Sequence, residues 1–320
     1  MSSDRAAGLP VAFRDRLLAQ LGAEDFERVL LALGQPRVRT LRANRLLTTP
    51  EELRAELENA GFGLEAAPQP FEDAFLLKSG ELRDLQETSA HTEGRFYLQS
   101  LSSMAAVLAL DPQPGEAVLD LCAAPGSKTS QIAACMRGRG RLVANDRSRK
   151  RGYKLRAVLE SQRALEMVEL STARGEAFAR REPGVFDRVL LDAPCSSEGR
   201  FRLDDERSWA DWKPSKVKRL AGEQRRLLLA AAVALRPGGV LVYSTCTFAP
   251  EENEAVLHKV LRRLGEEYEL VALPHAFPSE RPALTSWRDR CLDPRLAHAR
   301  RILPEGPMDG FFLARIEKRL

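Results

Sequence analysis

Two cysteines follow two separate apolar runs of this 320-residue chain, and each has neighbours that can take part in chemistry. Cys195 lies in 192-DAPCSSEGRF-201, directly after 185-VFDRVLLD-192, a run with the composition of a buried strand. Cys246 lies in 243-YSTCTFAP-250, at the end of a second such run. Cysteines in such places can be packing residues, a disulfide, metal ligands or reactive thiols.

The other cysteines and the histidines narrow these alternatives. The chain has five cysteines, which are Cys122, Cys135, Cys195, Cys246 and Cys291. Their number is odd, and a chain of this length can form a stable core without disulfides. None has C-x-x-C spacing and there are only 4 histidines, so we expect no metal site. A single buried cysteine is most often a packing residue, but two at strand ends, one of them near Asp192, favour reactive thiols.

The composition is that of a globular protein, with 44% hydrophobic and 29% charged residues. The apolar run 227-LLLAAAVAL-235 is too short to span a bilayer, and residues 1–18 lack the apolar core of a secretory signal. We therefore expect a cytoplasmic protein without a membrane partner. The net charge of +4 is compatible with a nucleic-acid partner but does not require one.

From about residue 117 onward, short apolar runs alternate with helical patterns. The expected strands are 117–121, 141–145, 166–170, 187–191 and 239–244, with a terminal strand at 310–318. The expected helices are 127–137, 148–162, 215–235 and 250–264, the last opened by Pro250, Glu251 and Glu252. Strands separated by helices predict a mostly parallel, doubly wound α/β sheet.

The first part of the chain has a different pattern. It combines helical segments at 11–33 and 50–61 with the basic segment 36-PRVRTLRANR-45 and weak strand candidates. This mixture predicts a small α+β domain over residues 1–105, in front of a main domain over residues 106–320.

The connection 194–214 is long and charged, which makes it a candidate substrate-facing loop. Its Trp209 and Trp212 can stack on bases, although core packing is favoured. The basic segments 36–45 and 147–151 fit phosphate contacts and a solvated charged surface about equally.

The first two expected strands end in residues suited to a nucleoside. The turn 120-DLCAAPGSKT-129 is rich in small residues but matches neither a P-loop nor G-x-G-x-x-G. The second strand ends at Asp146, whose carboxylate can accept both ribose hydroxyls or can cap the following helix. A ribose-binding acid without a phosphate cradle suggests a cofactor such as S-adenosylmethionine.

Four segments in this order resemble those of the Sun-type (Fmu-type) family of RNA cytosine-5 methyltransferases. They are 120-DLCAAPGSKT-129, 192-DAPCSSEG-199, 244-STCT-247 and 309-DGFFLARIEK-318. The resemblance covers residues 97–319, and only Leu41-Arg42-Ala43-Asn44 resembles that family's N-terminal RNA-binding domain. It implies a Rossmann-like class I methyltransferase fold with a terminal antiparallel strand. It also implies S-adenosylmethionine as cofactor and RNA as partner. By analogy we favour rRNA over tRNA, and we expect a monomer.

The family's chemistry assigns roles to four residues. Carbon 5 of cytosine is a poor nucleophile, and addition of a thiolate to carbon 6 activates it. The resemblance implies that Cys246, in Ser-Thr-Cys-Thr, is this nucleophile and that Cys195 assists product release. It implies further that Asp192 contacts the cytosine edge and that Lys128 positions or polarises the base.

The resemblance also implies a set of cofactor-binding residues. They are Cys122, Ala123, Ala124, Pro125, Gly126, Ser127, Lys128, Asp146, Arg151 and Asp192. One departure concerns the adenine, because Arg174 stands where the family has an acid for the adenine amine. Either Glu176 replaces that acid, or the backbone alone holds the adenine.

Two other functions compete with this hypothesis. A DNA cytosine-5 methyltransferase uses the Pro-Cys cysteine as nucleophile and needs no Ser-Thr-Cys-Thr, so Cys246 argues against it. A non-catalytic RNA-binding scaffold with a methyltransferase fold would account for Arg174. Against the scaffold stand the intact residues Asp120, Asp146, Asp192, Cys195 and Cys246.

Overall fold

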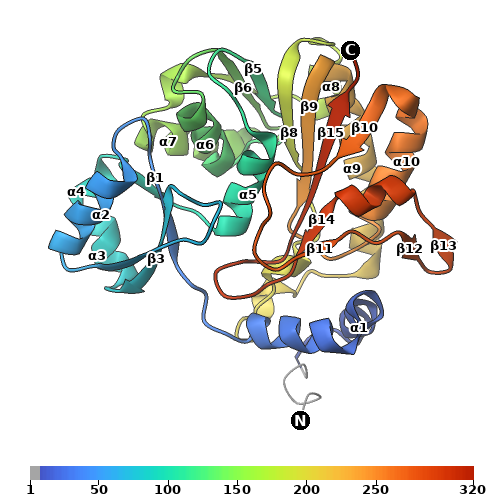
Figure 1. Cartoon of the computed structure of the whole chain (residues 1–320), viewed down its shortest axis with the longest axis horizontal. Coiled ribbons are helices and arrows are strands. Elements are labelled where there is room, and N and C mark those ends of the chain that lie inside the picture. The colour runs from blue at the N-terminus through green and yellow to red at the C-terminus, as the bar shows by residue number, and fades with distance from the viewer. Residues whose placement is uncertain (1–7) are drawn as a thin grey trace.

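The computed structural model describes residues 8–320, which form two β-sheets flanked by helices (Figure 1). The smaller sheet has the strand order β2-β3-β1-β4 and is antiparallel throughout. Its strands are β1 (Thr40–Ala43), β2 (Gly63–Ala66), β3 (Ala74–Ser79) and β4 (Phe96–Leu98). Its helices are α2 (Pro50–Asn59), α3 (Leu82–Glu87) and α4 (Ser89–Thr92).

The larger sheet has nine strands in the order β11-β14-β15-β9-β8-β5-β6-β7, with β10 paired to β15. The parallel strands are β5 (Ala117–Asp120), β6 (Arg141–Asn145), β7 (Val168–Ser171), β8 (Phe186–Asp192) and β9 (Leu235–Thr245). The antiparallel strands are β10 (Tyr268–Val271), β11 (Glu280–Pro282), β14 (Arg300–Ile302) and β15 (Phe311–Lys318). A separate short hairpin joins β12 (Ser286–Trp287) to β13 (Arg290–Cys291). This arrangement confirms the predicted α/β fold with an antiparallel terminal strand.

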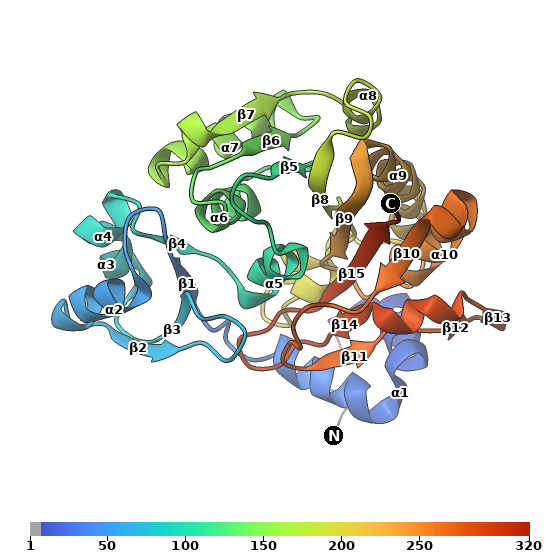
Figure 2. The ribbon, with the colours of Figure 1, turned by 45° about the horizontal axis from the view of Figure 1, so that its top comes forward.

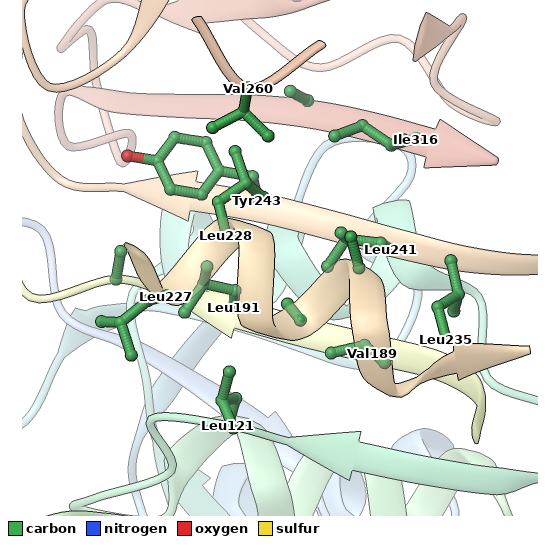
Figure 3. Packing of buried hydrophobic residues seen from close by; sticks show 14 of the residues in the cluster. Leu121, Val189, Leu191, Leu227, Leu228, Leu235, Leu241, Tyr243, Val260 and Ile316 are labelled. Atoms are coloured by element: carbon green, nitrogen blue, oxygen red, sulfur yellow. The ribbon is translucent and has the colours of Figure 1, made fainter. Parts of the chain in front are cut away.

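Helices cover both faces of the larger sheet because alternate strand residues point to opposite sides. On one face lie α5 (Leu101–Leu110), α6 (Ser127–Cys135) and α7 (Arg149–Ser161). On the other lie α8 (Gly175–Ala179), α9 (Pro214–Ala234) and α10 (Glu254–Leu264). Figure 3 shows Leu227 and Leu228 of α9 lying against Leu191 of β8 and Tyr243 of β9. The strand ends are therefore held by a continuous apolar core.

The smaller sheet lies beside α5 and α6 (Figure 2). Arg42 of β1 is buried at this junction, and its guanidinium donates to Gln99 at 3.0 Å and to Ser130 of α6 at 3.0 Å. Gln99 in turn donates to Gln131 at 2.8 Å. Arg42 is thus a structural residue of the junction, so the proposed tracking of phosphates by segment 36–45 is wrong for this arginine.

Helix α1 (Val11–Leu33) packs away from the smaller sheet, around the loop that follows β8. Its Phe13 stacks against Phe201 and Trp212 with ring centroids 5.0 and 5.7 Å apart. Trp209 and Trp212 are each 7% exposed, so core packing, the favoured interpretation, is confirmed for both. Contact therefore groups α1 with the larger sheet, while the division near residue 105 stays a prediction.

The expected helix 250–264 begins later than predicted, at Glu254. The side chain of Asn253 holds the preceding turn. Its Nδ2 donates to the Thr247 backbone carbonyl at 2.9 Å, and its Oδ1 accepts from the Thr245 hydroxyl at 2.6 Å. Pro250, Glu251 and Glu252 belong to this turn and lie before the helix. The expected strand 166–170 begins at Val168, after a short 3-10 turn. No helix within residues 8–320 is both long and apolar enough to cross a membrane.

Candidate active site

Cys195 and Cys246 lie next to each other at the carboxyl ends of β8 and β9. Asp192 and Ser244 are directly paired in these two parallel strands, so the loops that follow leave the sheet at the same edge. The two Sγ atoms are 3.2 Å apart, and the backbone N–H of Cys246 donates to Sγ of Cys195 at 3.4 Å. Both thiols are free and half-buried.

The environment of the pair makes its two thiols unequal. The contact with Cys195 lowers the pKa of Cys246, and the Ser197 hydroxyl and the charge of Arg200 act in the same direction. The contact with Cys246 and burial raise the pKa of Cys195. Cys246 is therefore the thiol that ionises first, which suits a nucleophile, while Cys195 keeps its proton.

Asp192 is fixed at the end of β8 by two neighbours. The Lys128 ammonium donates to Oδ2 at 2.7 Å, and the Ser244 hydroxyl donates to Oδ1 at 2.9 Å. The Lys128 ammonium also lies 5.9 Å from the centroid of the Phe311 ring. The structure therefore brings Lys128, Asp192 and the two cysteines to one edge of the sheet.

A cavity of about 650 Å³ opens at this edge. It is lined by Leu121, Cys122, Ala124, Asn145, Asp146, Arg147, Arg151, Arg174, Gly175, Glu176, Asp192, Ala193, Pro194, Cys195, Ser197, Glu223, Arg226, Leu227 and Cys246. Of the residues expected to hold a cofactor, Ala123, Pro125, Gly126, Ser127 and Lys128 do not line it. The cavity nevertheless joins the turn after β5 to both thiols, so one ligand can reach from Asp146 toward Cys246.

The turn after β5 approaches α7 closely at Gly126. Its φ of 113° lies in the left-handed region, and a Cβ there would come within 3.0 Å of Leu155. Only glycine fits such a position without strain. The first acid of the turn, Asp120, accepts from the Thr129 hydroxyl at 2.7 Å, and burial raises its pKa to about 7.

Asp146 already makes several contacts in the structure. One carboxylate oxygen accepts from the backbone N–H of Ser148 at 2.9 Å, and the other from that of Ala124 at 3.3 Å. The guanidinium of Arg151 lies 3.1 Å away. The alternative in which Asp146 caps α7 is wrong, because the N-cap is Ser148, whose hydroxyl accepts from the Arg151 N–H, and Asp146 holds only the N–H of that cap residue. A carboxylate has about four acceptor sites, so a ribose contact is compatible with these bonds.

Charged pairs surround the mouth of the cavity. Arg147 pairs with Glu223 of α9, and Arg226 pairs with Glu176 at 3.4 Å. Arg174, at the position where an acid was expected, has a largely exposed side chain 4.0 Å from Glu176. Glu176 lines the cavity, so both alternatives for the adenine remain open.

Sequence reasoning missed a buried polar cluster behind the cysteines, consisting of Ser196, Glu198, Gln224, Thr247 and Glu252. Burial raises the pKa of Glu252 to about 8 and raises that of Glu198 as well. Glu252 lies two residues after Pro250, and this local pattern predicts an acid in the first turn of a helix. Its polar neighbours come from distant segments, and no local signal marks them.

The raised pKa of Glu252 predicts that the protein loses stability as the pH rises. The unfolded carboxyl has a pKa near 4.5 and the folded one about 8, so between these values the folded state binds the extra proton. The free energy of unfolding should fall by up to about 1.4 kcal/mol per pH unit in this window. Glu252→Gln removes this contribution. Urea unfolding of both proteins from pH 5.5 to 8.5 should show a shallower decline for the variant, and parallel curves would contradict the assignment.

A model of the family described as 16S rRNA methyltransferase RsmB/F matches residues 107–317. Among curated proteins, the ribosomal RNA small subunit methyltransferase F of Vibrio parahaemolyticus is 37% identical over 97% of this chain. The chain spans only 63% of that relative's length. A tRNA (cytosine(49)-C(5))-methyltransferase of Pyrococcus abyssi is also 37% identical, over 92% of this chain and 93% of its own length.

Solved structures share the fold over nearly the whole chain. A methyltransferase homolog protein from Pyrococcus horikoshii has a TM-score of 0.85 and 33% identity, covering 99% of this chain and 98% of its own. NSun6 from Pyrococcus horikoshii, solved with SFG, has a TM-score of 0.81 at 21% identity, covering 97% of this chain and 98% of its own. The latter similarity concerns the fold alone.

Proposed function

The chain belongs to the 16S rRNA methyltransferase RsmB/F family, and from this membership we propose that it methylates carbon 5 of a cytosine in RNA, with S-adenosylmethionine as methyl donor. The observation that carries the proposal is the pair of thiols 3.2 Å apart, beside Asp192, in a cavity that also reaches Asp146. A binding scaffold needs no such pair.

We propose that Cys246 acts as the nucleophile. Its sulfur forms a bond to carbon 6 of cytosine, and the electrons of the C5=C6 double bond move toward carbon 5 and the ring nitrogen edge. When bound, S-adenosylmethionine supplies an electrophilic methyl group for carbon 5. Solvent water then takes the proton from carbon 5, the electrons of that C–H bond form the C5=C6 double bond again, and the electrons of the C6–S bond leave with Cys246 as its thiolate. Cys195, 3.2 Å away, is the neighbour placed to assist this release.

Asp192 and Lys128 are proposed to hold the base during the addition. Negative charge develops on the ring nitrogen edge as the sulfur bond forms, and a donor or positive group there stabilises it. The Lys128 ammonium, 2.7 Å from Asp192, supplies that charge and a proton to share. Asp192 can accept from the exocyclic amine of cytosine, which selects this base over uracil.

We propose that S-adenosylmethionine binds in this cavity with its ribose at Asp146 and its adenine toward Glu176 and Gly175, all three of which line it. From the turn after β5, Cys122 and Ala124 line the cavity and are proposed to lie beside the methionine part. SFG is an analogue of S-adenosylmethionine, so its presence in a protein of the same fold supports this choice of cofactor.

Asp146→Asn should weaken cofactor binding about 10- to 100-fold, because charge-assisted hydrogen bonds to ribose hydroxyls contribute roughly 1.5–3 kcal/mol. Titration calorimetry with S-adenosylhomocysteine measures this change. Asparagine keeps one acceptor for the backbone amides, and a melting curve checks that the turn stays folded. Cys246→Ala should bind with the affinity of the unmodified protein. Equal affinities for Asp146→Asn and the unmodified protein would remove Asp146 from the cofactor site.

We favour rRNA as the substrate because the family model is described by 16S rRNA and several relatives carry rRNA names. Residues 1–105 are proposed to bind the RNA, in the cytoplasm and as a monomer. An assay of labelled methyl transfer, with small-subunit rRNA and tRNA offered separately, distinguishes the alternatives. Methylation of tRNA alone would correct the substrate, and no transfer to either RNA or to total cellular RNA would favour the scaffold.

A further inference from the structure

We propose that Glu252, together with Gln224, is a positioning residue that holds Cys195 in place for release of the methylated base. The proposal rests on the proposed function, in which Cys195 assists that release. Glu252 is fully buried and does not line the cavity, so it does not touch the substrate. Its hydrogen bonds reach the reaction through the main chain that carries Cys195.

The two peptide groups that flank Cys195 are both hydrogen-bonded to the side chains of Glu252 and Gln224. The backbone N–H of Ser196, just after Cys195, donates to Oε2 of Glu252 at 3.0 Å. The carbonyl of Pro194, just before Cys195, accepts from the Gln224 amide at 2.9 Å. The same amide donates to Oε2 of Glu252 at 2.7 Å, which closes the arrangement. Cys195 is thus held from both sides by residues of α9 and of the turn after β9.

The same cluster connects the loop of Cys195 with the loop of Cys246. The hydroxyls of Ser196 and Thr247 are 2.7 Å apart, and each belongs to the residue that follows a cysteine. The hydroxyl of Tyr243 donates to the Glu252 carbonyl at 2.5 Å. These bonds set the position of Cys195 relative to Cys246.

Cys246 depends less on Glu252 than Cys195 does. It follows β9 directly, and that strand is paired with β8 up to Ser244 and with β15 up to Thr245. The Thr245 hydroxyl is also anchored on Asn253. Removal of the Glu252 carboxyl should therefore displace Cys195 and leave Cys246 able to attack. A Glu252 variant should therefore slow release of the methylated base without slowing formation of the adduct.

Glutamine is a suitable replacement for testing whether Glu252 acts by geometry. Within residues 8–320, Oε1 of Glu252 and Oε1 of Gln224 have no hydrogen-bond partner. An unpaired oxygen in a buried carboxylate disfavours the charged form, in agreement with the raised pKa of Glu252. The charge-free amide of Glu252→Gln keeps an acceptor for Ser196 and Gln224, whereas Glu252→Ala removes it.

The experiment compares Glu252→Ala, Glu252→Gln and the neighbouring control Glu251→Gln, with Cys195→Ala as reference. Single-turnover methyl transfer reports adduct formation, and denaturing gels report the adduct that remains. In Glu252→Ala we expect formation within about threefold of the unmodified protein, turnover at least about tenfold slower and a persistent adduct band. Glu252→Gln should restore turnover to within about threefold, and Glu251→Gln should resemble the unmodified protein.

Two results would overturn the inference. One is a folded Glu252→Ala protein that turns over normally without a persistent adduct. The other is an equal loss of formation and turnover, which marks a merely structural brace. If Glu252→Ala does not fold, Gln224→Met removes the bonds to Pro194 and Glu252 at similar size and must show the same retained adduct. If Cys195→Ala itself retains no adduct, the proposed division of roles fails instead.

Discussion

Cys246→Ala is expected to lower the rate of methyl transfer by at least about 10⁴-fold and to abolish any covalent RNA adduct. Without the thiol, carbon 5 of cytosine is not activated, because Cys195, the neighbouring thiol, has a raised pKa and is the poorer nucleophile. The lowered pKa of Cys246 favours its thiolate form near neutral pH. Transfer of a labelled methyl group to RNA, measured under reducing conditions, gives the rate.

The control for this variant is Cys291→Ala. Cys291 is exposed in the hairpin strand β13, outside the cavity, so its replacement should leave transfer unchanged. Cys246→Ser is also informative, because a serine hydroxyl keeps the size and hydrogen bonding but does not ionise near neutral pH. Activity within about tenfold of the unmodified protein in either Cys246 variant would show that the thiolate is not the nucleophile.

Cys195→Ala is expected to act at the opposite end of the reaction. Cys246 still attacks, but release of the product slows, so the protein should accumulate as a slowly migrating RNA adduct on a denaturing gel. Multiple turnover should fall at least about 100-fold, while the first methyl transfer falls much less. The difference follows from the geometry, in which Cys195 lies 3.2 Å from the attacking sulfur and keeps its own proton.

Loss of the hydrogen bond from Cys195 also removes the main cause of the lowered pKa of Cys246. The first transfer in Cys195→Ala should therefore shift its pH dependence upward, toward the ordinary cysteine value. A double variant lacking both thiols should form no adduct at any pH, which would show that the adduct of Cys195→Ala is carried by Cys246. If Cys195→Ala lost the adduct and Cys246→Ala retained it, the two roles would have to be exchanged.

The local pattern of the sequence was sufficient to predict the parallel sheet and to place both cysteines at strand ends. Each strand from β5 to β9 is a short apolar run ended by polar residues, and parallel strands present those ends at one edge. The proximity of Cys195 to Cys246 follows from the pairing of neighbouring strands. Which strands are neighbours depends on tertiary packing, so the 3.2 Å contact needed the structure.

The residues that sequence analysis missed are those whose roles depend on distant contacts. Glu252 has the local context of a helix start, and only burial against Gln224 and Ser196 changes its chemistry. Arg42 lies in a basic segment, yet its partners come from later parts of the chain. Asp before a helix is a common cap, yet the cap of α7 is Ser148, and Asp146 accepts from the N–H of that residue instead.

The identity of the attacking residue can be measured directly with RNA that carries 5-fluorocytosine at the methylated position. Fluorine replaces the carbon-5 proton that must be removed before Cys246 can leave, so the adduct formed after methyl transfer is trapped. Proteolysis and mass spectrometry then locate the modified nucleotide on one peptide. We predict that it is attached to the peptide containing Cys246, with Cys195 unmodified. Attachment to Cys195, or methyl transfer without any trapped adduct, would contradict the central claim.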